Sequence, residues 1–317
     1  MYIGFDIGGT KCAVTLADTA GNIQKKIRFD TTTAAETQEK LLLAAEELAR
    51  GQRVIAAGIS CGSPLDSEKG VILSPPNLPG WDRVPITEMV TKRLGVPAFL
   101  CNDANACALA EWKYGAGQGT RHMIFLTFGT GFGAGLILDG RLYEGRDGMA
   151  GEIGHVGLSE QGPVGYGREG AAEGYCSGGG IAQIGQTLAR AAIQKGTPAS
   201  FCPTLADLPA ITARSVAEAA DGGDEVAREV YRISGRRLGQ ALGILIDLFN
   251  PECIVIGSVF KRAEHLLRPA MEESLGKYGI AASVAGCRIL PAVHDGDLGD
   301  LAAIAIAAMN AEKNGLV

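Results

Sequence analysis

The sequence lacks the features that mark secreted, membrane-spanning and zinc-clustering proteins. Its 8 cysteines are scattered along 317 residues without a Cys-x-x-Cys pair, which argues against a disulfide framework and a paired-cysteine zinc site. No run approaches the ~20 apolar residues of a membrane span. The opening MYIGFDIGGTK has neither the basic nor the apolar region of a signal peptide. We therefore expect a cytoplasmic protein with reduced, mostly buried thiols and no membrane partner.

Positive charge is also scarce: 29 lysines and arginines stand against 35 aspartates and glutamates, a net charge of −6. This balance argues against a surface that grips nucleic-acid phosphates, so we expect no nucleic-acid partner. With 46% hydrophobic residues the chain is not disordered, and its length suits two domains with separate cores. A protein that acts on small molecules fits these limits.

Short apolar segments separated by glycine turns open the chain as a β-meander. Strands are predicted at Tyr2–Asp6, Cys12–Leu16 and Ile23–Phe29. Helices and strands then alternate along the chain: the predicted helices are Ala34–Ala49, Ile86–Leu94 and Ala104–Lys113, and the predicted strands are Val54–Ser60 and Ala98–Cys101. A meander followed by alternating strands and helices predicts a mixed sheet covered by helices.

The opening pattern returns after the glycine-rich segment 115–119. Two strands, His122–Phe128 and Ala134–Leu138, flank the turn Gly129-Thr130-Gly131, from which we infer an internal duplication. A glycine-rich loop region follows at about 144–180. The remaining predicted elements are a helix at Val230–Phe249, a strand at Cys253–Ile256 and a helix at Leu301–Asn310.

The two glycine turns, 7–10 and 129–131, carry the clearest chemistry. Backbone without Cβ atoms can approach a phosphate closely, with successive N–H groups pointing at its oxygens. One such turn alone could be a simple hairpin. Two that face each other across a cleft, the first with Asp6, Thr10 and Lys11 attached, favour a nucleotide phosphate site.

Two other nucleotide motifs are excluded. No GxxxxGK[ST] string is present, so a Walker A loop is absent. Gly129–Ala134 satisfies the relaxed dinucleotide pattern G-x-G-x-x-A, but that pattern must run into a helix. Here residues 135–140 predict a strand closed by a turn, so we reject dinucleotide binding.

Four motifs in order resemble the ROK family, which contains bacterial sugar kinases and related repressors. They are Asp6–Lys11, Asn102–Ala106, Phe128–Gly135 and Gly151–His155, and the resemblance covers essentially the whole chain. It implies an α/β protein with the duplicated actin-like (ribonuclease-H-like) ATPase fold, two lobes with a central cleft. The implied lobes are residues 1–116 plus 298–317, the smaller, and 117–297, the larger, with the sugar-binding loops.

The resemblance also implies a nucleotide site. It assigns the ATP phosphates to Asp6, Gly8, Gly9, Thr10, Lys11, Thr127, Gly129, Thr130, Gly131 and Gly133, with Gly257 on the adenosine side. Asp6 is similar to the family carboxylate that positions Mg²⁺ through water. Lys11 either reaches the phosphates or remains a solvated lysine.

Asp103 is the candidate general base for phosphoryl transfer to a sugar hydroxyl. It lies at a strand-to-helix junction, at the sheet edge where open α/β sheets bind ligands. The same place suits a helix N-cap, which Asn102 or Asp103 could supply. The match of Asn102–Asn105 to the family motif favours the catalytic role.

Glu152 and His155 lie in a glycine-rich segment typical of binding loops, and carboxylates and imidazoles bind sugar hydroxyls. His155 could instead be a hydrogen-bonded structural histidine. The resemblance implies a sugar site made of Gly62, Asn77, Asn102, Asp103, Glu152, His155 and Glu173. Trp81, near Asn77, suits core packing better than sugar contact.

One departure from the family concerns zinc. Family members commonly carry a cysteine-rich zinc motif after the Gly-His segment, but Val164, Tyr166 and Ala171 replace its cysteines here. His155 alone cannot make a tetrahedral site. We predict no zinc, and expect packing around Tyr166 to hold His155 in place.

Taken with the resemblance, these residues predict an ATP-dependent sugar kinase, with ATP and Mg²⁺ as cofactors, that phosphorylates the primary hydroxyl of a glucose-like aldohexose. A kinase of N-acetylglucosamine or N-acetylmannosamine is the alternative, and allose and fructose stay open. A transcriptional regulator or a catalytically silent sugar sensor are alternatives of other classes. The first strand starts at Tyr2, so we expect no DNA-binding module. Retention of Asp6, both turns and Asp103 favours the enzyme. The resemblance further implies a homodimer.

Overall fold

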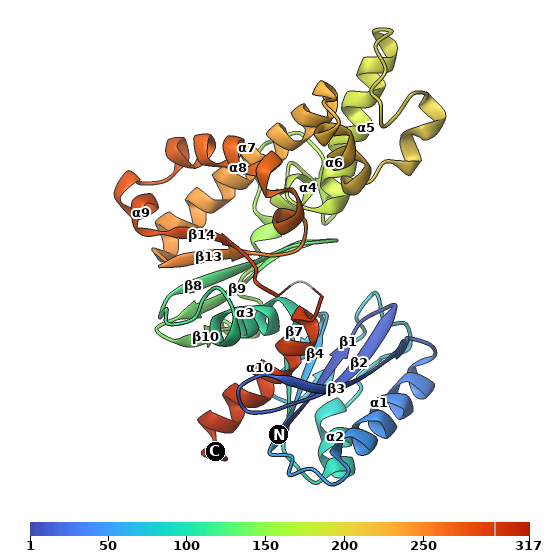
Figure 1. Ribbon diagram of the computed structural model, residues 1–317, viewed down its shortest axis with the longest axis vertical. Helices are drawn as coiled ribbons and strands as arrows, with labels where there is room; N and C mark the ends of the chain where they lie inside the picture. Colours follow the sequence, from blue (N-terminus) through green and yellow to red (C-terminus); the bar gives the residue numbers. More distant parts are fainter. Residues whose placement is uncertain (295) are drawn as a thin grey trace. The chain divides into compact units, whose positions relative to one another are not determined.

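Strand pairing gives the chain two five-stranded sheets with the same internal order. We describe a computed structural model that covers residues 1–294 and 296–317 (Figure 1). The sheets run β3-β2-β1-β4-β7 and β10-β9-β8-β13-β14. Each has antiparallel strands at one edge and parallel strands at the other. The repeated order confirms the duplication that the sequence predicts.

The first sheet consists of β1 (Tyr2–Ile7), β2 (Lys11–Ala17), β3 (Ile23–Asp30), β4 (Ala56–Cys61) and β7 (Ala98–Asn102). It is accompanied by α1 (Ala34–Ala49), α2 (Ile86–Leu94), α3 (Asp103–Tyr114), α10 (Leu298–Lys313) and the small pair β5 (Leu65–Asp66) and β6 (Val71–Ile72). Side chains alternate across β1. Ile3 and Phe5 share a buried core with α1, whereas Tyr2 packs with α10 on the opposite face. Asp6 belongs to the α10 face.

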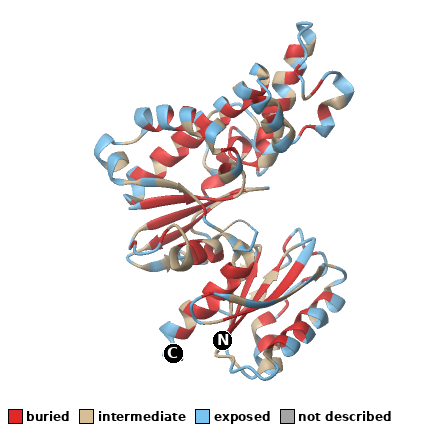
Figure 2. Cartoon of the chain, viewed as in Figure 1, coloured by how far each residue is buried: buried red, intermediate tan, exposed pale blue. Residues whose placement is uncertain are grey.

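Helix α10 lies directly on the backbone of the first sheet. A Cβ at Gly58 would lie 2.0 Å from the carbonyl oxygen of Ala303, and one at Gly4 would lie 2.9 Å from its Cβ. No side chain fits at either position. The helix is buried along most of its length (Figure 2).

The second sheet consists of β8 (Met123–Phe128), β9 (Phe132–Leu138), β10 (Arg141–Tyr143), β13 (Cys253–Ile256) and β14 (Arg288–Pro291). The segment after β10 holds η1 (Ile153–His155), β11 (Val164–Gly165), β12 (Arg168–Glu169) and α4 (Ala172–Tyr175). The remaining helices are α5 (Gly178–Gln194), η2 (Leu205–Ala210), α6 (Ala213–Asp221), α7 (Glu225–Phe249), α8 (Val259–Tyr278) and α9 (Ala281–Gly286). Helix α7 begins five residues before its predicted start because Asp224 caps it, accepting from the Ala227 N–H at 3.0 Å.

Packing divides the chain into two compact units. The first is Met1–Arg121, Gly135–Ala150 and Val293–Val317; the second is His122–Ala134 and Gly151–Ala292. The expected larger lobe includes residues 135–150, which here fall in the first unit. Gly135 gives the reason, since a Cβ there would lie 2.6 Å from the Ala108 Cβ, so β9 rests directly on α3.

The structure also bears on the expectations for cysteines and membranes. All eight cysteines are free thiols, six of them buried. Within the described ranges 1–294 and 296–317, no helix has both the length and the apolar composition needed to cross a bilayer.

Candidate active site

The first glycine turn joins β1 to β2. The Gly8 N–H donates to the Lys11 carbonyl at 3.2 Å, and Thr31 Oγ1 donates to the Gly8 carbonyl at 2.7 Å. A Cβ at Gly9 would lie 2.4 Å from the Asn77 carbonyl oxygen, so glycine lets the loop that carries Asn77 rest on this turn. Residues 9–11 are exposed. The turn therefore offers open backbone and a lysine to a ligand.

Asp6, near the end of β1, lies in an acidic cluster of the first unit. A Cβ at Gly299, in the first turn of α10, would lie 2.5 Å from Asp6 Oδ2, so the carboxylate abuts the start of that helix. Asp300, 3% exposed, forms an ion pair with Lys26. Burial first, and then the negative charges of Asp300 and Asp103, raises the pKa of Asp6 to about 6.

Asn102, and not Asp103, caps α3. Asn102 Oδ1 accepts from the N–H groups of Ala104 at 2.9 Å and Asn105 at 3.4 Å, and its Nδ2 donates to Ser63 Oγ at 2.8 Å. Asp103 is the first helical residue and its Oδ1 accepts from the Ala104 N–H at 2.8 Å. Asp103 is exposed, yet loss of surrounding water raises the pKa of its carboxyl. Of the two candidate caps, Asn102 is therefore the N-cap of α3.

Gly62 lies beside both Asn77 and Asp103. A Cβ at Gly62 would lie 3.9 Å from Asp103 Oδ2 and 3.8 Å from the side-chain amide atoms of Asn77. Asp6, Gly62 and Asp103 stand at the carboxyl ends of three neighbouring parallel strands, β1, β4 and β7. The first unit thus gathers these predicted residues at the edge where open α/β sheets bind ligands.

The second glycine turn joins β8 to β9 in the second unit. Thr127 Oγ1 accepts from the Gly133 N–H at 3.0 Å, so this side chain fixes its own hairpin. Glu173 Oε2 accepts from the Phe132 N–H at 3.1 Å, and a Cβ at Gly131 would lie 2.9 Å from the same oxygen. The predicted sugar residue Glu173 is therefore bonded to the predicted phosphate turn.

A cavity of about 800 Å³ opens beside this turn. Gly129 and Thr130 line one part of it, and Ser258 and Val259, at the start of α8, line another. Further walls come from Gly178, Ala182, Ile211, Ala213, Ala217 and Tyr231. The size suits a small organic molecule. Gly257, expected on the adenosine side, immediately precedes Ser258 and Val259, which both line the cavity.

Glu152 and His155 are both exposed; Glu152 immediately precedes η1, and His155 is the last residue of η1. The imidazole of His155 stacks on the phenol ring of Tyr166, with ring centres 3.8 Å apart and planes inclined by 28°. The structure thus brings His155 together with the residue that we expect to hold it.

The residues around His155 do not fit a zinc ion. Zinc takes four nitrogen, sulfur or carboxylate ligands, and Val164, Tyr166 and Ala171 offer no thiolate. Cys176 lies nearby in sequence but is buried. In the part of the chain that the structure describes, no three His, Cys, Asp or Glu side chains form a group that could hold a metal ion directly.

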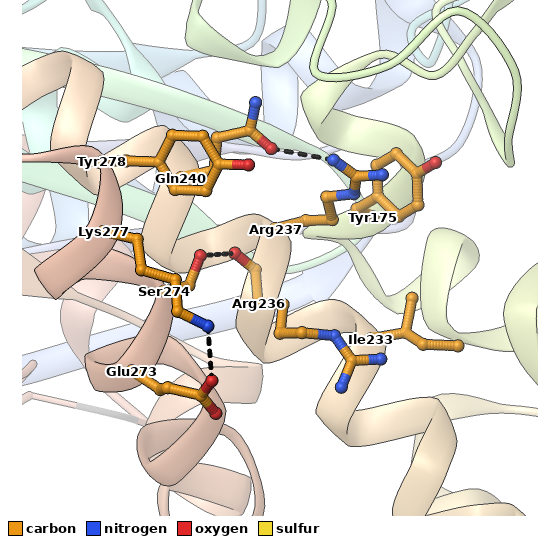
Figure 3. Close-up of a pocket in the computed structure, with 9 residues that line it drawn as sticks. All are labelled: Tyr175, Ile233, Arg236, Arg237, Gln240, Glu273, Ser274, Lys277 and Tyr278. Carbon is orange, nitrogen blue, oxygen red and sulfur yellow. Dashed lines mark hydrogen bonds and ion pairs between the residues drawn. The ribbon is translucent and has the colours of Figure 1, made fainter.

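A smaller cavity of about 360 Å³ is lined by residues of α7, α8 and Tyr175, and by none of the predicted site residues (Figure 3). One of its walls nevertheless supports the predicted sugar loop. Arg237 Nη1 and Gln240 Nε2 both donate to the Leu158 carbonyl, at 3.2 and 3.3 Å. The Arg237 guanidinium lies 5.0 Å from the centre of the Tyr175 ring. The loop that follows His155 is anchored here.

Sequence reasoning missed two features of the site. The first is the ion pair of Asp300 with Lys26, completed by Thr15 Oγ1, which donates to Asp300 Oδ1 at 3.0 Å. The sequence contained a signal for this ion pair, because an aspartate in a largely apolar helix needs a partner. The second is the set of cavity walls in the second unit, which separate helices supply without a common motif.

Comparisons with known proteins identify the family of the chain. The model of the ROK family matches residues 2–310. A glucokinase of Thermotoga maritima is 33% identical over 96% of this chain and 96% of its own. An N-acetylmannosamine kinase of Escherichia coli is 33% identical over 84% of this chain and 85% of its own.

Solved structures extend the likeness to the fold. A ROK family glucokinase from Streptomyces griseus in complex with glucose and AMPPNP has a TM-score of 0.77 and 30% identity, covering 97% of this chain and 99% of that one. A ROK family transcriptional regulator has a TM-score of 0.86 and 28% identity, covering 99% and 79%. Together with the repeated strand order, these neighbours confirm the duplicated actin-like (ribonuclease-H-like) fold.

Proposed function

The chain belongs to the ROK family, and we propose that it is a sugar kinase that transfers the γ-phosphoryl group of ATP to the primary hydroxyl of a glucose-like aldohexose. One observation carries the proposal: Asp6, Gly62 and Asp103 stand in a row at the carboxyl ends of three parallel strands. The sequence identity with glucokinases supports the hexose.

Asp103 is the proposed general base. A carboxyl with a raised pKa binds a proton more readily, which favours removal of the hydroxyl proton as the oxygen attacks phosphorus. Asn102 takes over the capping of α3, so Asp103 is not committed to that role. Gly62, which lies beside Asp103, and Asn77, which lies beside Gly62, are proposed to receive the sugar.

Asp6 is the proposed holder of Mg²⁺ through water. Burial, and then the negative charges of Asp300 and Asp103, raise the pKa of Asp6; a divalent cation would favour the ionised carboxylate, and oxygen donors suit Mg²⁺. When bound, Mg²⁺ would neutralise charge on the transferring phosphoryl group. We assign both glycine turns to the ATP phosphates and the 800 Å³ cavity to the nucleoside.

Glu152, His155 and Glu173 are the proposed sugar ligands of the second unit. Glu152 and His155 are exposed and polar, and a carboxylate can bind two adjacent hydroxyls. An N-acetylhexosamine is the second candidate substrate, supported by the identity with N-acetylmannosamine kinase. By family resemblance, we also propose a homodimer, which light scattering after gel filtration would test.

ADP release over a panel of hexoses and N-acetylhexosamines tests the proposal. Turnover with glucose above that with N-acetylmannosamine and N-acetylglucosamine supports the first candidate, and the reverse order supports the second. Absence of turnover with every sugar would refute the enzyme and favour a sugar sensor, the class to which the similarity with a transcriptional regulator points.

A further inference from the structure

The hairpin β11–β12 follows His155 and turns at Tyr166 and Gly167. Val164 pairs with Glu169 and Gly165 with Arg168, which leaves a two-residue loop. Both loop residues have positive φ, +52° for Tyr166 and +72° for Gly167, as a type I′ turn requires. Such turns favour asparagine or glycine at the first position, so a tyrosine there points to a role beyond the turn.

The tyrosine ring covers His155. The two rings are stacked at 3.8 Å between centres. Gly154 permits this approach, because a Cβ there would lie 3.1 Å from Tyr166 Cε2 and 2.2 Å from the Phe132 carbonyl oxygen. A planar contact of this kind fixes the plane of an exposed imidazole that otherwise rotates freely.

Gln183 on α5 holds the foot of the same hairpin. Its Nε2 donates to the Val164 carbonyl at 2.9 Å, and its Oε1 accepts from the Val164 N–H at 2.9 Å. One side chain thus satisfies both backbone groups of a residue that stands at a family cysteine position. Gly165 lies closely against Glu173, since a Cβ at Gly165 would lie 2.8 Å from the Glu173 Cβ.

The far side of the loop is tied to α7. Arg237 and Gln240 donate to the Leu158 carbonyl, and the Leu158 N–H donates to the Gly170 carbonyl at 2.8 Å. Hydrogen bonds, a ring contact and close packing thus hold this segment, and none of these contacts involves a metal ion.

We infer that Tyr166 is a positioning residue that orients His155 toward the sugar, on a hairpin that Gln183 and the α7 side chains support in place of a metal ion. This inference rests on the proposed function, in which His155 binds a sugar hydroxyl. On this inference the ring stack increases the affinity for the sugar, because an imidazole held in one orientation loses less freedom when the sugar binds.

Tyr166→Asn is the informative variant, since Asn-Gly is a favoured type I′ pair and the hairpin keeps its fold while the ring is lost. We expect the hexose KM to rise about 3- to 10-fold, with kcat and the KM for ATP within about two-fold, as for loss of an aromatic contact made equally in ground and transition states. Tyr166→Phe should restore the wild-type KM. Tyr278→Asn is the matched control, because Tyr278 is as exposed as Tyr166, 54% in each case.

A second readout does not depend on activity. The chain has 4 histidines, so the imidazole protons of His155 can be assigned by NMR with His155→Gln. They should shift upfield in the wild type and in Tyr166→Phe, and lose that shift in Tyr166→Asn. An unchanged shift, an unchanged hexose KM in Tyr166→Asn, failure of Tyr166→Phe to restore it, or stoichiometric zinc in purified protein would overturn the inference. If the wild type turns over no sugar, the proposed function fails, while the NMR comparison still decides whether the ring orients His155.

Discussion

Replacing Asp6 by asparagine should abolish turnover and yet make the protein more stable at neutral pH. The carboxylate is held against the start of α10, near Asp300 and Asp103, and its pKa is raised to about 6. In the unfolded chain the same group titrates near 3.8. The folded state therefore binds the Asp6 proton more tightly, and the stability this carries is lost as pH rises from about 4 to about 7.

The size of the effect follows from the shift. A rise from 3.8 to about 6 corresponds to about 3 kcal/mol of unfolding free energy at ~1.36 kcal/mol per pH unit. Asparagine never ionises and avoids this cost. We expect Asp6→Asn to exceed the wild type by about 3 kcal/mol above pH 7, or about 5 °C in melting temperature for a chain of this length, with the gap shrinking toward zero near pH 4.

Urea unfolding and thermal melts between pH 4.5 and 8 measure the gap, and ADP release measures the loss of function. Asp30→Asn, an exposed aspartate at the end of β3, is the control and should change neither quantity. A gap that is absent at pH 8, or equal at pH 4.5 and pH 8, would refute the electrostatic reasoning. Retained turnover would remove Asp6 from the site.

Three further perturbations test other parts of the structure. Asp103→Asn should lower kcat about 10²- to 10⁴-fold while hexose affinity, measured by calorimetry, stays within about three-fold. Turnover at the wild-type rate would refute the assignment of Asp103 as general base. Lys26→Met should cost about 3–5 kcal/mol in urea unfolding, since it leaves the buried Asp300 unpaired, and a loss under about 1 kcal/mol would show that the pair is dispensable. Ala217→Trp, which places an indole ring in the wall of the 800 Å³ cavity, should raise the KM for ATP and leave the hexose KM unchanged; equal rises in both would place the nucleoside elsewhere.

The local patterns of the sequence were enough to predict the strands of the first sheet, β8, β9 and β13 of the second, and the helices α1, α2, α3, α7 and α10, whereas α5, α6 and α8 were not predicted. Helices α1 and α2 have the predicted bounds, because apolar spacing and a cap such as Thr33 act within a few residues. Helix α7 was predicted to begin at Val230, whereas it begins at Glu225, where Asp224 caps it. Residues 135–150 could not be placed with the first unit, since only packing of Gly135 on Ala108 decides it.

The same distinction holds for the site: a local motif predicts some of its residues, and only the folded structure shows the others. Asp103 and its neighbours could be proposed because a short motif carries them and the end of a parallel strand gives them a common edge. The division of roles between Asn102 and Asp103 needed coordinates, since either side chain can cap a helix. The cavity that we propose for the nucleoside could not be foreseen, because separate helices supply its walls without a common motif.

The close fit of α10 on Gly4 and Gly58 has a consequence for biosynthesis. Residues 298–313 leave the ribosome after the whole second unit, yet they cover one face of a sheet whose strands all lie within the first 102 residues. During translation that face has no cover of its own, and its apolar surface is open to chaperones and to neighbouring nascent chains. Most of the first unit is thus synthesised first, but its sheet is covered only when α10 has been made. Premature termination before residue 298 would release a polypeptide in which one face of this sheet is uncovered.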